Sequence, residues 1–139
     1  MILVIRISGL VEVPYSVQET LFRMRLRRKY SAVLLKETNE NLKLLKVVRN
    51  FVAYGPINKE TLYALIEKRA QPIDKKKKLD ALAVAEQLDK KSLADLNIKP
   101  FFRLHPPRKG IDSKLHFPLK KGVLGDNKEK INDLVRRML

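Results

Sequence analysis

The stretch "YSAVLLKETNENLKLLKVVRNFVAYG", residues 30–55, changes its apolar periodicity twice. It begins with a short run rich in valine and leucine and continues with apolar residues at helical spacing, Leu42, Leu45 and Val48. A second apolar run follows, and a glycine-proline pair stops it. These patterns predict a strand, a helix and another strand in succession, joined by connections of only a few residues.

The flanking residues extend this alternation in both directions. "ILVIRI", residues 2–7, predicts a first strand, and "SVQETLFRMRLRR", residues 16–28, predicts a helix in which Ser16 and Glu19 have capping-box spacing. "NKETLYALIEKRA", residues 58–70, predicts a further helix after the last strand. A β-α-β-α-β order of this size favours an α+β fold: a ferredoxin-like split β-α-β core with a three-stranded, mostly antiparallel sheet and helices on one face.

The second half of the chain is interpreted as an extension, so that residues 1–70 form the core and residues 71–139 pack on it. The extension contains a helix-favouring segment, "LDALAVAEQL", a basic diproline loop, "FRLHPPRKG", and a glycine-containing segment expected to form a hairpin. It ends in a predicted helix with an apolar stripe of Ile131, Leu134, Val135 and Met138. The lysine run at 75–78 is interpreted as a solvated linker, with direct contact to phosphates as the alternative. No self-contained apolar core is expected in the extension.

The composition favours a polyanionic partner. The 139 residues include 30 Lys and Arg against 15 Asp and Glu, which gives a formal charge of +15. The cations are spread along the chain, which fits nucleic acid better than a membrane surface. No stretch approaches the roughly 20 apolar residues of a transmembrane helix. The absence of cysteine excludes disulfides and a thiolate zinc site.

The sequence contains no recognisable catalytic or metal-binding set. His105 and His116 are the only histidines, and their spacing does not make a metal pair on a helix. The carboxylates occur mostly at helix caps or at spacings that pair them with nearby lysines. We therefore interpret the chain as a protein that is not an enzyme and that binds no cofactor and no metal.

Two cationic segments are the candidate RNA-binding residues. "RMRLRRK", residues 23–29, is expected to place Arg23 and Arg27 on one helix face, beside a turn that carries further cations. A solvated helix end that complements the helix dipole is the alternative. The diproline loop has fixed φ angles, so it loses little conformational entropy when it binds. The full candidate set is Arg23, Arg27, Arg28, Lys29, Arg103, His105, Arg108, Lys109, Lys114, Lys120 and Lys121.

The same segments carry a resemblance to a known family. "IRISGL", "ETLFRMRLRRKYSAVLLKETNENLKLLKVVRNFVAYGPI" and "LIEKRA", followed by "FFRLHPPRKG", "GVLGD" and "INDLVRRM", resemble the archaeal and eukaryotic branch of the large-subunit ribosomal protein family numbered thirty. The first 70 or so residues resemble the whole of the short bacterial form. The remainder resembles the extension found in archaea and eukaryotes.

This resemblance implies a cytoplasmic structural component of the large ribosomal subunit. It implies binding to the large-subunit, 23S-type rRNA, with 5S rRNA as an additional contact to test, and one copy per subunit beside neighbouring ribosomal proteins. It implies no membrane, no cofactor and no small-molecule substrate. The residues carried over from the family are Arg27, Arg28, Arg103, His105, Pro106, Pro107, Arg108, Lys109 and Gly110.

Two hypotheses from other classes stay open at this point. The first is a free-standing RNA-binding or tRNA-handling module with the same fold, which would be found outside assembled ribosomal subunits. The second is a small enzyme that uses His105 and His116, which would need a substrate pocket and a pH optimum tied to those side chains.

Overall fold

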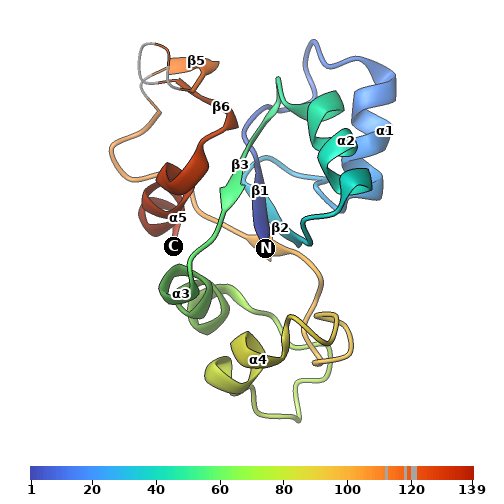
Figure 1. The fold of residues 1–139 in the computed structure, drawn as a ribbon, viewed down its shortest axis with the longest axis vertical. Coiled ribbons are helices and arrows are strands. Elements are labelled where there is room, and N and C mark those ends of the chain that lie inside the picture. Colours follow the sequence, from blue (N-terminus) through green and yellow to red (C-terminus); the bar gives the residue numbers. More distant parts are fainter. Residues whose placement is uncertain (112, 118, 120–121) are drawn as a thin grey trace.

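The computed structural model of the chain describes residues 1–111, 113–117, 119 and 122–139. Along the chain the elements are β1 (Ile2–Arg6), α1 (Tyr15–Arg23), β2 (Ser31–Leu35), α2 (Asn39–Val48), β3 (Val52–Pro56), α3 (Lys59–Arg69), α4 (Ala81–Gln87), β4 (Phe102–Arg103), β5 (Ser113–His116), β6 (Gly122–Asp126), the 3-10 helix η2 (Lys128–Lys130) and α5 (Ile131–Met138). The fold is mixed α+β, as the sequence predicts (Figure 1).

The strands form one six-stranded sheet in the order β4-β2-β1-β3-β6-β5. The first three strands are antiparallel as predicted, with Val4 of β1 opposite Val33 of β2 on one side and Tyr54 of β3 on the other. The predicted limit of three strands is wrong, because the extension adds β4 beside β2 and adds β6 in parallel to β3. The predicted hairpin is also wrong, since β5 pairs with β6 in parallel, with an irregular register.

Helices cover both faces of this sheet, so the prediction of helices on one face is wrong. On one face α1 and α2 pack against Ile2 and Val4 of β1, while α3, α4 and α5 pack against Leu3 and Ile5 on the other (Figure 1). The physical reason is visible in the first strand. Its apolar residues are continuous where a half-exposed strand would alternate with polar ones, and a continuous run is typical of a strand buried on both faces.

Of the apolar clusters on the two faces of the sheet, the cluster that includes Leu3 consists mostly of residues from the extension. Ile98, Phe102, Ile131 and Val135 are all fully buried in the cluster that includes Leu3. Burying a side chain of this size contributes roughly 1.5–3 kcal/mol. The two halves of the chain therefore share this apolar cluster and one sheet.

Two predicted helices match closely. The second helix spans its predicted residues, Asn39–Val48, and the Thr38 side chain caps it by accepting from the Asn41 amide at 3.3 Å. In α5 the predicted apolar stripe, from Ile131 to Met138, is buried throughout. Both segments have a clear 3.6-residue period, which is the strongest local signal for a helix, and α2 also has a side-chain cap.

The first helix is shorter than predicted and begins differently. It ends at Arg23, because Arg25 adopts a left-handed backbone with φ of 66°. Its N-cap is Pro14, with no side-chain cap hydrogen bond, so the predicted capping box does not form. Arg23 and Arg27 consequently do not share a helix face. Arg27 lies on the irregular turn that leads to β2.

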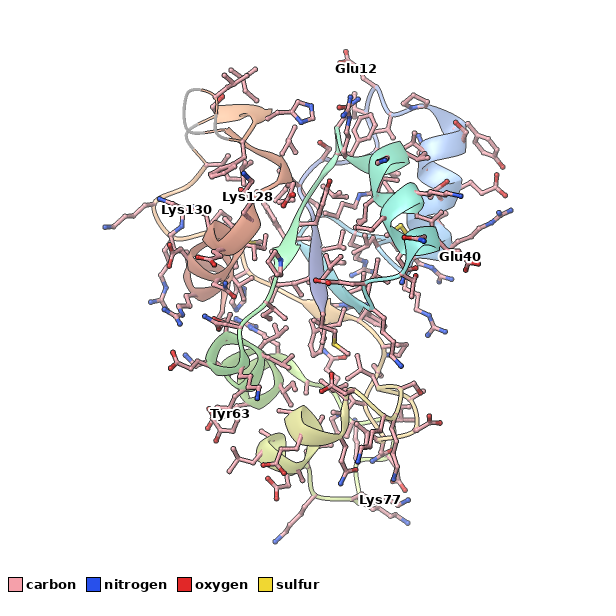
Figure 2. All side chains as sticks on the ribbon, in the orientation of Figure 1. Glu12, Glu40, Tyr63, Lys77, Lys128 and Lys130 are labelled. Carbon is pink, nitrogen blue, oxygen red and sulfur yellow. The ribbon has the colours of Figure 1, made fainter. Side chains whose placement is uncertain are left out.

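The lysine run at 75–78 is exposed, and hydrogen bonds join its neighbour Asp74 to Asn97. The Asp74 amide donates to Oδ1 of Asn97 at 2.9 Å, and the Asn97 amide group donates back to the Asp74 carbonyl at 3.2 Å. Figure 2 shows Lys77 at the end of the molecule opposite Glu12. This part of the chain is a supported turn, and contact with phosphates stays an untested alternative for its lysines.

Candidate nucleic-acid interface

An open groove of about 850 Å³ lies between the end of α1 and the edge strand β4. We call it the arginine groove, and its lining residues are Glu19, Phe22, Arg23, Arg25, Arg27, Arg28, Ser31, Phe101 and Arg103. Five of the nine are arginines and one is a carboxylate, which pairs with Arg23 at 2.7 Å. A concave surface with this charge concentrates anions and suits phosphate binding.

Strand pairing brings the two halves of the groove together. Arg103 of β4 stands opposite Ser31 of β2, and the Leu104 amide donates to the Tyr30 carbonyl at 3.0 Å. Arg103 therefore reaches the groove through the same backbone contacts that place β4 at the sheet edge. The sequence predicts Arg23, Arg27, Arg28 and Arg103 as separate candidates, and the structure places all four in one site.

Buried Arg6 supports the turn that carries the groove's arginines. Its side chain is 1% exposed and donates to three carbonyls: Leu26 at 2.7 Å, Ser8 at 2.9 Å and Gly9 at 3.1 Å. Its own carbonyl accepts from the Tyr30 amide at 2.7 Å. Burial lowers the pKa of Arg6 below its usual value, and the three carbonyls stabilise the charged form. Arg6 thus positions the turn without facing the groove.

Two phenylalanines interrupt the cationic lining. Phe22 is 43% exposed at the end of α1, and the guanidinium carbon of Arg103 lies 5.7 Å from the centre of the half-buried Phe101 ring. Exposed aromatic rings beside arginines are the elements on which unpaired bases stack. Sequence reasoning missed Phe22, Phe101 and Arg25. An aromatic residue directly before Arg23, on the polar side of its helix, was the available signal.

Lys29 lies outside the groove lining, and its ammonium group lies 5.1 Å from the centre of the Tyr30 ring. Tyr30 has a left-handed backbone with φ of 64°. The backbone therefore turns sharply at Tyr30, directly before β2 begins. Lys29 extends the cationic surface next to the groove.

The diproline loop is held against the last turn of α5. The His105 amide donates to the Met138 carbonyl and the Arg108 amide donates to the Arg137 carbonyl, each at 3.0 Å. The Arg137 side chain donates to the Gly110 carbonyl at 3.3 Å. These bonds satisfy carbonyls that the end of a helix leaves without partners. The loop is therefore stiffened by the fold as well as by its prolines.

The loop presents its cations outward. Pro107 is buried, whereas His105, Arg108 and Lys109 are exposed. Lys109 has a left-handed backbone with φ of 65° and is followed by Gly110 at 71°, which closes a tight turn. The loop forms a second cationic surface, continuous along the chain with Arg103.

The remaining predicted cations are not placed. Lys120 and Lys121 lie outside the described residues, and so does the side chain of Lys114, whose backbone belongs to β5. In the described part of the chain, no group of three or more His, Asp or Glu side chains is arranged to hold a metal. Among the same residues, no helix has the length and apolar character that a membrane crossing needs.

A mixed α+β fold with a large positive charge and an arginine groove interrupted by aromatic rings is typical of the nucleic-acid-binding class of proteins. Comparison with known sequences narrows this class. The family described as Ribosomal protein L30p/L7e matches residues 2–52. The chain is 40% identical to the large ribosomal subunit protein uL30 of Archaeoglobus fulgidus, over 99% of each chain.

Two further relatives agree along the whole length. The uL30 protein of Methanococcus maripaludis is 38% identical over 98% of this chain and 97% of its own, and that of Methanobrevibacter smithii is 36% identical over 100% of both. The chain therefore belongs to the L30p/L7e family of ribosomal proteins. The predicted family is confirmed, and so is the prediction that the chain is not an enzyme, because these relatives are named as ribosomal proteins.

Proposed function

We propose that the chain is a structural constituent of the large ribosomal subunit in the cytoplasm, where it binds 23S-type rRNA through the arginine groove and the diproline loop. The observation that carries the proposal is the arginine groove itself. It gathers five arginines and two aromatic rings from two segments that lie far apart in the sequence. The names of the relatives, all proteins of the large subunit, support the same assignment.

The two kinds of side chain divide the work of binding RNA. The planar guanidinium groups of Arg27, Arg28 and Arg103 match phosphate oxygens in a two-bond fork. The rings of Phe22 and Phe101 offer stacking surfaces for unpaired bases, worth about 1–3 kcal/mol for each base. The arrangement favours an irregular or single-stranded rRNA segment over a regular duplex, whose bases are already stacked.

The finer partner assignments are part of the same proposal. One copy binds per subunit, beside neighbouring large-subunit proteins, and 5S rRNA is a further contact to test. Within the RNA-binding surface, His105, Arg108 and Lys109 of the diproline loop act together with Lys29, Lys114, Lys120 and Lys121. The diproline loop is held by backbone bonds to α5, so its part of the surface has a fixed shape before RNA arrives.

The core supports a ferredoxin-like interpretation of its architecture. We infer that β1-α1-β2-α2-β3 forms a split β-α-β unit, because β1 lies between β2 and β3 and is antiparallel to both. Both connecting helices cover the same face of those strands. The extension, together with α3, covers the other face and adds Phe101 and Arg103 to the arginine groove.

The test removes charge from the groove and compares it with equal removal elsewhere. One variant replaces Arg27, Arg28 and Arg103 by glutamine, and the control replaces three surface cations of α2 and α3, Lys43, Lys46 and Lys59. Binding to 23S rRNA fragments is measured as a function of salt. We expect the groove variant to bind more weakly and to lower the slope of log affinity against log salt by roughly 2–3. Equal losses in both variants would contradict the groove assignment.

Leucine at Phe22 and Phe101 tests the stacking role separately. This double variant keeps the charge and most of the apolar volume. We expect weaker binding to unpaired RNA with the salt slope unchanged, because no phosphate contact is removed. A changed slope with unchanged affinity at low salt would argue against stacking.

A further inference from the structure

The strand β2 is only partly covered at the outer edge of the sheet. The two residues of β4 pair with Ser31 and Ala32, and the register stops there. The rest of β2, residues 33–35, has β1 as its partner on the inner side, with Leu34 opposite Leu3. Unpaired strand edges offer backbone donors and acceptors that another extended chain can join.

The backbone alternation shows which groups face this open edge. The Tyr30 carbonyl points toward β4, since it accepts from the Leu104 amide at 3.0 Å. Within the regular strands, backbone groups alternate between the two edges. The Met1 carbonyl accepts from the Ile57 amide, so the backbone groups of Ile2 and Val4 face β2. Leu35 and Val33 stand opposite these two residues and face β1 in return, so Ala32 and Leu34 face the outer edge. Ala32 is covered by β4. The amide and carbonyl of Leu34 lie at the edge beyond it.

The residues directly before β4 pair with another segment of the chain, so they cannot extend β4 along this edge. The Lys99 amide donates to the Gln71 carbonyl at 2.9 Å, and Ile98 forms a bridge with Pro72. Pro100 follows and lacks a backbone N–H, so it cannot donate to a neighbouring strand. The segment before β4 therefore turns away from β2 and leaves a groove.

This second groove, which we call the edge groove, has a volume of about 410 Å³. Its floor is apolar and includes Val33, Leu34, Leu88 and Leu93. Its cations are Arg23, Arg25, Lys36 and Lys91, and its lining residues include no carboxylate. An occupant that matches both properties alternates apolar side chains with acidic ones.

We propose that the edge groove binds an extended acidic segment of another protein, which adds a strand to β2 beyond β4. Main-chain hydrogen bonds to Leu34 would provide affinity, and alternate side chains would contact the apolar floor and the cations, as in other cases of strand addition. A protein segment fits better than RNA, because phosphates do not use an apolar floor or a strand edge. The inference does not depend on RNA binding in the arginine groove, although Arg23 and Arg25 line both grooves.

The probe is a fluorescent, acetylated peptide of eight alternating glutamate and valine residues, tested with the full-length protein. Two matched peptides accompany it: one N-methylated at every backbone amide, which has no N–H to donate to a strand edge, and one with lysine in place of glutamate. Fluorescence anisotropy gives the affinity, and the amide resonance of Leu34 reports the location. We expect the acidic peptide to shift that resonance. Each matched peptide should bind at least about tenfold more weakly than the acidic peptide.

Charge reversal on the protein provides the second arm. Lys36→Glu with Lys91→Glu changes cations that line only the edge groove, and Lys43→Glu with Lys46→Glu changes the same charge on α2. We expect the first pair to weaken peptide binding about tenfold and the second less than twofold. Equal effects of the two pairs, or equal binding of the N-methylated peptide, would overturn the proposal. A shift of the Leu34 amide by polyuridylate instead of the peptide would overturn it by assigning the groove to RNA.

Discussion

Replacing Arg6 by methionine tests whether a buried guanidinium holds the RNA-binding turn in place. Methionine keeps a similar apolar stem but removes the donors to Leu26, Ser8 and Gly9. Of the three bonds, the one to the Leu26 carbonyl is buried, so water cannot easily replace the lost donor there. The other two bonds are partly buried, and water can compensate them in part.

The magnitude follows from opposing terms. A hydrogen bond to a charged group contributes about 1.5–3 kcal/mol, so three contribute roughly 4.5–9 kcal/mol before compensation. Removing the guanidinium also removes its desolvation cost, which is several kcal/mol for a buried ion. We therefore expect Arg6→Met to lower the free energy of unfolding by about 2–4 kcal/mol. For a chain of this size that corresponds to a fall in melting temperature of roughly 5–15 °C.

Urea unfolding followed by circular dichroism measures this change, and Arg49→Met, at an exposed arginine, is the control. Arg6→Lys should be at least as destabilising as methionine, because a lysine keeps the buried charge but cannot reach three diverging carbonyls. The affinity for rRNA should fall in both Arg6 variants with the salt slope unchanged, since no phosphate contact is lost. A loss of stability no larger than that of Arg49→Met would refute the reasoning.

Three further tests have expected outcomes. Gly55→Ala should cost about 1–3 kcal/mol in urea unfolding, because the added Cβ would meet the Lys128 carbonyl oxygen, a backbone atom; an unchanged midpoint would show that the helix start shifts easily. Burial, and secondarily the charge of Asp126, raise the pKa of Tyr54, so Asp126→Asn should lower its midpoint in a titration at 295 nm. The raised pKa means that stability is unaffected below about pH 10 and falls as pH rises through the folded-state pKa, and Tyr54→Phe should abolish this fall. A fragment of residues 1–70 should melt below the full chain and bind a hydrophobic dye, because it lacks the cover of one sheet face; equal melting temperatures would contradict the shared core.

The local signals in the sequence were sufficient for most elements. The 3.6-residue period around Leu45 and the stripe that ends at Met138 each predicted a helix that the structure contains. The end of α1 was not predictable in this way, because the arginines that follow Arg23 have good helix propensity. A tertiary contact decides it: Leu26 turns back to the Leu21 carbonyl at 2.9 Å, and Arg6 holds the Leu26 carbonyl.

The candidate site was predicted in its parts and not as a whole. Charge counting singled out Arg27, Arg28 and Arg103, but it gave no reason to place them together. It also passed over Arg6, which interrupts an apolar strand and therefore indicates a buried charge that needs partners. Its three carbonyl partners are backbone groups, which no pattern of side chains reveals.

The sequence by itself determined the α+β class, the succession of the first three strands and their helices, the positive charge and the family to which the chain belongs. Only the tertiary structure decided that the extension completes the sheet and that helices enclose both faces. Both outcomes depend on pairings between distant segments, such as Ser31 with Arg103 and Ala53 with Gly125. Such pairings are selected by the joint burial of two surfaces, and neither surface carries that information in its own local pattern.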